Sequence, residues 1–418
     1  MKKIDTYEKT RTILPPFSFV IRCASLLCRT LERVKVKKIG RIPKPPYLLI
    51  CSHASFMDFF SAIKATLPHQ PYWVSTIEEY IDKDFIFREL GVIPKRKFTN
   101  DPRIATMMLE VLKDRKKILI IYPEARYSFV GHPERIDNGI AKLAKNAGVP
   151  IVFLNNHGHY LRDPQWGDHK IRKIRPIVDE MKCIVSKKYV QMLSAEEIQE
   201  IILENFKFDE EQYQLDNNIR VTYKKRAEGI ERILYKCPHC GKEYEMSSKG
   251  TNFKCDACGV EYTLNEDGTI SCLNNEAKFT KVSDWYYWEK ECCRKEVLDG
   301  TYFYEDDVRV EHLEGTGVGF VPMKGKYHLK HTIDEGVVVT SDNDFKFVRS
   351  PLQNYAIHIE FDYKGRGGCI DLATNTETYF VYPLNNAKAL TKIHFANEII
   401  YDLHKNELKK WGPNYENE

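Results

Sequence analysis

The sequence contains no apolar run long enough to cross a membrane. Its most apolar stretch, Phe17 to Cys28, is twelve residues long and is interrupted by Arg22, whereas a spanning helix needs about 20 apolar residues. A cleaved signal peptide is not indicated either, because Pro15-Pro16 precede this stretch and no small-residue cleavage site follows it. The net charge of +4 is too small to indicate a polyanionic partner by itself. We therefore expect a cytoplasmic protein that is peripheral on the membrane.

The positive charge is concentrated at the N-terminus. Residues 1–50 contain twelve Lys or Arg against three acidic residues. Arg22, Arg29 and Arg33 fall on one helical face, and apolar residues surround them. This pattern is typical of a helix that lies in an anionic membrane interface, so we assign residues 1–44 to a basic amphipathic membrane-interface segment. The alternative is a solvated basic helix packed on its own domain.

Most of the twelve cysteines are scattered and lack the spacing of metal ligands. This distribution favours an intracellular, reducing compartment. The four exceptions form two C-x2-C-G knuckles suited to a Zn²⁺ ion: Cys237, Cys240, Cys255 and Cys258. A site with four thiolates has no open coordination position. The sequence thus predicts a zinc ribbon with a structural metal, which with a charged connector spans residues 219–272.

The charge of this ribbon does not suit nucleic acid. Residues 229–270 carry five cations against seven acidic residues, whereas binding to nucleic acid depends on neutralising phosphate. We expect no nucleic acid partner. A protein contact through the ribbon or the C-terminal domain and a purely stabilising role both remain open.

Short apolar runs alternate with amphipathic helical patterns between residues 45 and 218. Helices are predicted from Phe56, from Asp101-Pro102 and from Glu134. Buried strands are predicted at residues 47–50, 70–75, 118–122 and 149–154. This alternation predicts an α/β fold with a mainly parallel, helix-covered sheet.

Residues 273–418 are predicted to be β-rich and to end in a helix. Turn signals separate candidate strands at 336–340, 356–361 and 378–382. Asn385 to Lys405 then has the pattern of one amphipathic helix. This order is similar to a pleckstrin-homology or GRAM-like module, with a β-sandwich appendage as the alternative.

A polar stretch from Cys51 to Asp58 lies where a predicted strand ends and a predicted helix begins. Open α/β sheets bind ligands at this edge. His53 can serve as a general base if the Asp58 carboxylate fixes its tautomer. Residues five apart do not share a helical face, so this pairing requires His53 before the helix and Asp58 in its first turn. The alternative is that Ser55 to Asp58 is only a capping box.

Three further blocks follow in order, at Gly91 to Lys97, Tyr122 to Ser128 and Val149 to Ile151. With His53-x4-Asp58 they resemble the signature H-x4-D, G-x-I-x-x-x-R, F-P-E-G-T-R-S and V-P-I/V of glycerolipid acyltransferases of the 1-acylglycerol-3-phosphate acyltransferase type. The resemblance covers residues 45 to 185.

Two departures from that signature matter. Lys97 stands at the arginine position of the second block, with Arg96 immediately before it. In the third block Ala125, Arg126 and Tyr127 replace Gly, Thr and Arg, so the guanidinium is displaced by one position.

The resemblance implies a membrane-surface O-acyltransferase in phospholipid biosynthesis. It would move a fatty acyl group from acyl-CoA or acyl carrier protein to a hydroxyl of lysophosphatidate or a related lysophospholipid or glycerophosphate. His53 would be the base and Asp58 its partner, with no acyl-enzyme, since the sequence has no nucleophile elbow. The implied head-group ligands are Arg96, Lys97, Glu124 and Arg126. The rival hypothesis is a non-catalytic lipid-binding scaffold with a zinc-ribbon interaction module.

Overall fold

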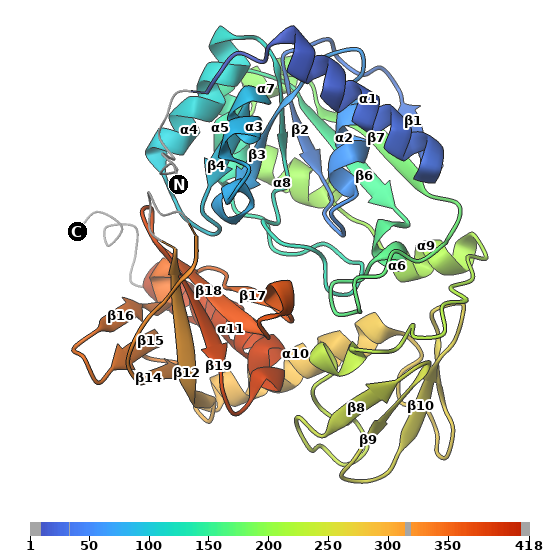
Figure 1. The fold of residues 1–418 in the computed structure, drawn as a ribbon, viewed down its shortest axis with the longest axis vertical. Coiled ribbons are helices and arrows are strands. Elements are labelled where there is room, and N and C mark those ends of the chain that lie inside the picture. The colour runs from blue at the N-terminus through green and yellow to red at the C-terminus, as the bar shows by residue number, and fades with distance from the viewer. Residues whose placement is uncertain (1–9, 33, 314–318, 411–418) are drawn as a thin grey trace. The chain divides into compact units, whose positions relative to one another are not determined.

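The computed structural model describes residues 10–32, 34–313 and 319–410 (Figure 1). The chain forms two compact units. The first holds the chain up to Arg96, Asn100–Tyr223 and Glu266–Gly268, and the second holds Lys97–Thr99, Lys224–Asn265 and the chain from Thr269 onward. The predicted domain boundaries at residues 44, 218 and 272 stay predictions.

The first unit is built on a seven-stranded sheet of order β1-β7-β6-β2-β5-β3-β4. Its strands are β1 (Lys35–Ile39), β2 (Tyr47–Cys51), β3 (Tyr72–Thr76), β4 (Val92–Lys95), β5 (Ile118–Ile121), β6 (Ile151–His157) and β7 (Val178–Val185). Among these strands every neighbouring pair is parallel except β6 and β7. The predicted α/β fold with a mainly parallel sheet is therefore confirmed.

Helices pack on both faces of this sheet. They are α1 (Pro15–Glu32), α2 (Asp58–Thr66), α3 (Asp84–Glu89), α4 (Pro102–Leu109), α5 (Gly139–Ala147), α6 (His159–Arg162), α7 (Lys187–Met192), α8 (Ala195–Asn205) and α9 (Glu210–Asp216). Ile50 and Phe153 of the sheet share one apolar core with Met107 of α4 and Leu143 of α5. Leu49, at an alternate position, is equally buried and points to the opposite face, where α2 packs on β6 and β7.

The second unit contains two antiparallel sheets. The smaller has the order β11-β10-β9-β8 and is formed by β8 (Met246–Lys249), β9 (Asn252–Cys255), β10 (Glu261–Leu264) and β11 (Ile270–Cys272). The larger follows the order β16-β15-β14-β12-β19-β18-β17, with β13 paired to β12. Its strands are β12 (Phe303–Leu313), β13 (Val321–Pro322), β14 (Tyr327–Thr332), β15 (Gly336–Ser341), β16 (Lys346–Arg349), β17 (His358–Glu360), β18 (Cys369–Ala373) and β19 (Thr378–Pro383).

Two long helices accompany these sheets, α10 (Val282–Leu298) and α11 (Leu390–Lys410), and they pack against each other. The β-rich C-terminal region that ends in a helix is thus confirmed. The likeness to a pleckstrin-homology or GRAM-like module stays a prediction.

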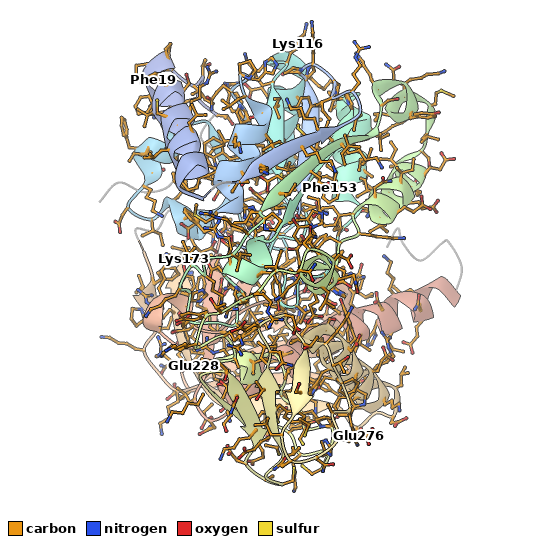
Figure 2. All side chains as sticks on the ribbon, turned by 90° about the vertical axis from the view of Figure 1, so that its right-hand side faces the viewer. Phe19, Lys116, Phe153, Lys173, Glu228 and Glu276 are labelled. Carbon is orange, nitrogen blue, oxygen red and sulfur yellow. The ribbon has the colours of Figure 1, made fainter. Side chains whose placement is uncertain are left out.

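The N-terminal helix α1 carries apolar side chains on its outer surface. Phe19 is 67% exposed, whereas Phe153 in the core is 6% exposed (Figure 2). Val20, Leu26 and Leu27 of α1 are exposed as well. Of the three arginines predicted to share a basic face, Arg33 and the Arg29 side chain lie outside the described residues. Among the described residues, no helix has the length and apolar character that crossing a membrane requires.

A comparison of two glycines tests the packing at the turn between α3 and β4. Gly91 has a φ of +73°, and a Cβ there would lie 2.6 Å from Cε1 of Tyr72. Gly40 has a φ of +67° and nothing within 4 Å of such a Cβ. Both alanine variants carry the left-handed penalty of about 1–2 kcal/mol, but only Gly91→Ala adds overpacking of about 1–3 kcal/mol. We expect Gly91→Ala to lower the Tm clearly more than Gly40→Ala in thermal unfolding followed by circular dichroism. Equal losses would contradict this account.

Candidate active site

His53 and Asp58 meet at the carboxyl end of β2. His53 lies in the loop after β2, and Asp58 is the first residue of α2. Nδ1 of His53 is 3.2 Å from Oδ2 of Asp58. The His53 side chain is 18% exposed and that of Asp58 is fully buried. The imidazole is thus reachable from outside while its partner carboxylate is not, which is the arrangement that a general base requires.

The Asp58 carboxylate also organises the loop that carries His53. Oδ2 accepts hydrogen bonds from the backbone amides of Ala54 at 2.6 Å and Ser55 at 2.9 Å. Burial opposes the charged form, but His159 and His53 outweigh it and hold the pKa of the Asp58 carboxyl well below its ordinary value. Asp58 therefore pairs with His53 and binds the amides of the loop before α2. The alternative of a Ser55–Asp58 capping box is wrong, because α2 begins at Asp58 itself and its N-cap residue, Met57, has no side-chain cap hydrogen bond.

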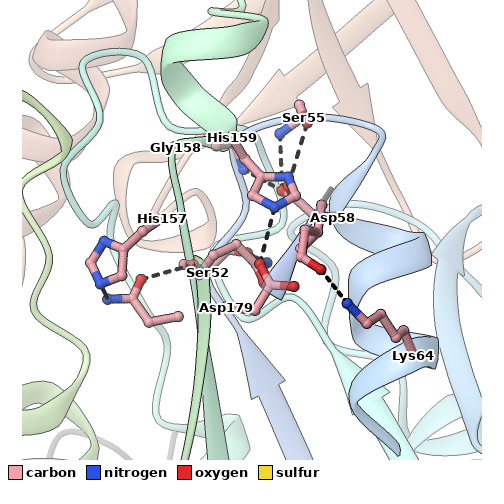
Figure 3. Close-up of polar contacts among 12 residues, drawn as sticks. Ser52, Ser55, Asp58, Lys64, His157, Gly158, His159 and Asp179 are labelled. Carbon is pink, nitrogen blue, oxygen red and sulfur yellow. Dashed lines mark hydrogen bonds and ion pairs between the residues drawn. The ribbon is translucent and has the colours of Figure 1, made fainter. Parts of the chain in front are cut away.

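A second histidine, His159, contacts the carboxylate of Asp58 (Figure 3). Nδ1 of His159 is 2.8 Å from Oδ1 of Asp58, and its Nε2 is 3.1 Å from Oδ1 of Asp179 on β7. All three side chains are fully buried. Burial alone would lower the pKa of His159, but the two carboxylates raise it to about 10.

The neighbouring His157 belongs to a separate network. Its Nδ1 is 2.8 Å from Oε1 of Glu210 on α9, and its ring stacks on Tyr213. Asn155 contacts Nε2 of His157 and accepts a hydrogen bond from the Ser52 hydroxyl. This network ties the exit of β6 to α9 and to the residue before His53.

Residues of the third block hold the His53 backbone from both sides. The His53 amide donates to Oε1 of Glu124 at 3.1 Å, and the Ser128 amide donates to the His53 carbonyl at 2.7 Å. Oε2 of Glu124 accepts from the Glu134 amide at 2.7 Å. Burial raises the pKa of the Glu124 carboxyl. In this structure Glu124 supports the loop of His53, and its assignment to a head group stays a prediction.

Two tyrosines of the third block pack on the His53 ring. The ring centroids of Tyr122 and Tyr127 lie 4.0 and 4.2 Å from that of His53. Tyr127 stands where the acyltransferase signature has arginine. At this position of the signature the present chain therefore has an aromatic ring beside the candidate base.

The three cations predicted to bind a head group do not gather as an exposed cluster. Arg96 and Arg126 are only 3% and 2% exposed. Lys97 belongs to the second unit, where its Nζ lies 3.5 Å from Glu360 Oε1 and 3.3 Å from Asp371 Oδ2. Their roles toward a substrate stay predictions.

The four predicted metal-ligating cysteines do come together. Cys237 and Cys258, and likewise Cys240 and Cys255, have sulfur atoms 3.7 Å apart, and all four lie within 4.8 Å of one another. A tetrahedron with metal–sulfur bonds of about 2.3 Å has sulfur–sulfur edges of about 3.8 Å. The cluster can thus hold a metal ion.

Both knuckles have the same backbone geometry. The amides of Gly241 and Gly259 donate to the carbonyls of Cys237 and Cys255 at 2.9 and 2.8 Å. Both glycines adopt positive φ, at +74° and +73°, which L side chains rarely do. The glycine after each knuckle therefore closes the turn around the four sulfur atoms.

A mainly parallel sheet with a histidine–carboxylate pair at its carboxyl edge defines an α/β protein of the open-sheet class. The role of His53 as a general base stays a prediction. Residues 33–154 match the model of a protein family described as Acyltransferase.

Similarity to individual proteins is weaker. No curated protein matches the chain. Among solved structures, the chain is similar to the crystal structure of the 1-acyl-sn-glycerophosphate (LPA) acyltransferase PlsC from Thermotoga maritima, with 20% identity and a TM-score of 0.36 over 45% of this chain and 76% of that one.

The backbone at Ala125 offers a test of the third block. Ala125 has a φ of +54° at the position where the signature has glycine. An alanine in this conformation carries a penalty of about 1–2 kcal/mol that glycine avoids. We expect Ala125→Gly to raise the free energy of unfolding by about 0.5–1 kcal/mol, after allowing for the greater freedom of glycine in the unfolded chain.

Urea unfolding checks this expectation. The matched control is Ala105→Gly inside α4, a right-handed helix, which should lower the free energy of unfolding by about 1 kcal/mol. A loss of stability in both variants would show that the left-handed backbone at residue 125 carries no penalty for alanine.

Proposed function

We propose that the first unit catalyses O-acyl transfer from a thioester donor, acyl-CoA or acyl carrier protein, to a hydroxyl of lysophosphatidate or a related lysophospholipid or glycerophosphate. The observation that carries the proposal is the His53–Asp58 pair, with Nδ1 and Oδ2 3.2 Å apart, inside a domain that matches the acyltransferase family. The family supports acyl transfer in general, and the donor and acceptor come from the resemblance of the four blocks.

The geometry suggests how the pair would act. With the Nδ1 proton directed to Asp58, Nε2 of His53 is the basic nitrogen. It takes the proton of the acceptor hydroxyl as the oxygen attacks the thioester carbonyl carbon. A carbon–oxygen bond forms, the carbon–sulfur bond breaks, and the proton on His53 passes to the departing thiolate. No acyl-enzyme is needed, because the acceptor oxygen is itself the nucleophile.

Two further assignments belong to this proposal. Arg96, Lys97, Glu124 and Arg126 are assigned to the acceptor head group through the family resemblance. The exposed apolar residues of α1, which are Phe19, Val20, Leu26 and Leu27, together with the basic N-terminus, support action at an anionic membrane surface.

Removal of the base tests the mechanism. We expect His53→Gln and Asp58→Asn each to lower the rate of acyl transfer about 10²–10⁴-fold, measured with labelled acyl-CoA and a panel of lysophospholipids. His69→Gln is the matched control, because His69 is exposed at the end of α2 and should keep full activity. Circular dichroism and metal content should be unchanged in His53→Gln and His69→Gln. Asp58→Asn should in addition lower the Tm, because it removes one partner of a buried ion pair.

The same assay separates the proposal from its rival. A wild-type protein that binds the lysophospholipids but transfers no acyl group from either donor would favour the non-catalytic scaffold. Full activity in His53→Gln would exclude His53 as the base.

We propose further that the four cysteines hold a structural Zn²⁺. The 3.7 Å sulfur–sulfur distances fit a tetrahedral tetrathiolate site, which has no open position for substrate. Zinc would join the two knuckles and stabilise the small sheet of the second unit.

Loss of one ligand tests this assignment. We expect Cys258→Ser to lose the zinc found by elemental analysis and to lower the Tm of the second unit. Cys272→Ser is the control, since Cys272 lies on β11 of the same sheet but outside the sulfur cluster. One zinc per chain in Cys258→Ser would contradict the site.

A further inference from the structure

Three ionisable side chains near the candidate base form a buried carboxylate–imidazole–carboxylate arrangement. Asp58 begins α2, His159 begins α6 and Asp179 lies on β7. Each ring nitrogen of His159 faces a carboxylate oxygen, at 2.8 Å on the Asp58 side and 3.1 Å on the Asp179 side (Figure 3). All three side chains are fully buried and therefore shielded from bulk solvent.

This geometry decides the protonation of His159. A neutral imidazole has one N–H and one acceptor nitrogen, and an acceptor nitrogen against a carboxylate oxygen is repulsive. Only the doubly protonated ring presents an N–H to both oxygens: Nε2 hydrogen-bonds Asp179, and Nδ1 forms a close ion pair with Asp58. Two buried carboxylates would also repel each other strongly without a cation between them.

We propose that His159 is held as an imidazolium between Asp58 and Asp179 and thereby sets the charge that His53 experiences, which makes His159 a positioning residue for the proposed acyl transfer. This inference rests on the proposed function only where it concerns catalysis. His159 does not touch the reacting atoms in this scheme, and it acts through Asp58.

The charge arithmetic gives the consequence. With two carboxylates and one imidazolium the buried group carries one net negative charge, which His53 neutralises when it binds a proton. Without the His159 charge the two buried carboxylates would repel each other, and one of them would take up a proton. Without the Asp179 charge the remaining pair would be neutral, and the pKa of His53 would fall.

The other titratable groups described around Asp58, His159 and Asp179 do not provide a positive charge that could replace that of His159. Cys51 at the end of β2 and Tyr122 after β5 both face Asp58 and Asp179, and burial raises the pKa of each, so both are neutral. On α9, Glu210 contacts His157 and the Gly158 amide. Lys64 of α2 donates to the Val34 carbonyl.

Histidine titration by nitrogen NMR on the full-length, labelled protein tests the proposal without an assay of activity. The His53 and His159 signals are assigned from His53→Gln and His159→Gln. We expect both ring nitrogens of His159 to carry protons from pH 6 to pH 9. The His53 signal should titrate at a pH about one unit lower in Asp179→Asn than in the wild type, because one negative charge is lost. It should move less in His159→Gln, in which one carboxylate takes up a proton. His157→Gln is the control. It removes an equally close histidine–glutamate pair and should leave the titration of His53 unchanged.

A purely structural role of Asp179 would leave the titration of His53 unmoved in Asp179→Asn. A neutral His159 at pH 7.5, or an unmoved His53 signal in Asp179→Asn, would overturn the proposal. If His159→Gln does not fold, the titration of the wild type and of Asp179→Asn still tests the proposal. The acid limb of the pH–rate profile should follow the same shifts. An inactive protein that shows the expected NMR shifts would refute the proposed function alone, and an active protein without them would refute this inference alone.

Discussion

The need to stabilise the buried carboxylate of Asp58 constrains the ligand edge of the first unit. An ionised carboxylate without water requires several donors. Asp58 finds them in the amides of Ala54 and Ser55, in the His53 ring and in His159. These donors come from the loop after β2 and from the segment after β6, so a single charge fixes the mutual position of two strand ends and the start of α2. The candidate base is held in place by the same group that orients its ring.

The third block completes this arrangement from the side of β5. Glu124 and Ser128 bind the amide and the carbonyl of His53, while Tyr122 and Tyr127 pack on its ring. Two of the residues that depart from the acyltransferase signature have different effects here. Ala125 adopts a left-handed backbone, with a φ of +54°, and Tyr127 adds an aromatic ring to the surroundings of the imidazole.

The parts of this structure that the sequence predicts are those with a strong periodic or spacing signal. The central strands β2, β5 and β6 are continuous apolar runs because both faces of the sheet are covered. The cysteine knuckles and the His53–Asp58 spacing are local patterns.

Strands β1 and β7 escape prediction because they mix charged and apolar residues near the sheet edge, and β12 buries Asp306 within its alternating pattern. His159 escapes because its partners, Asp58 and Asp179, are distant in sequence and meet it only through the strand order. The head-group residues were assigned by motif alone, and the burial of Arg96 and Arg126 could not be inferred from their positions in the chain.

Neither compact unit is one continuous piece of the polypeptide. Lys97–Thr99 leaves the first unit between two of its elements, and Glu266–Gly268 returns to it from the midst of the second. The carbonyl of Glu266 accepts from the amide of Val221 at 2.7 Å and from the side chain of Gln214 at 3.0 Å. A gene truncated after Tyr223 would leave these donors without their acceptor, and the remaining half would lose the lysine that balances Glu360 and Asp371. Evolution by simple exchange of modules is therefore restricted in this chain, since a recombination point between its halves would break bonds inside both.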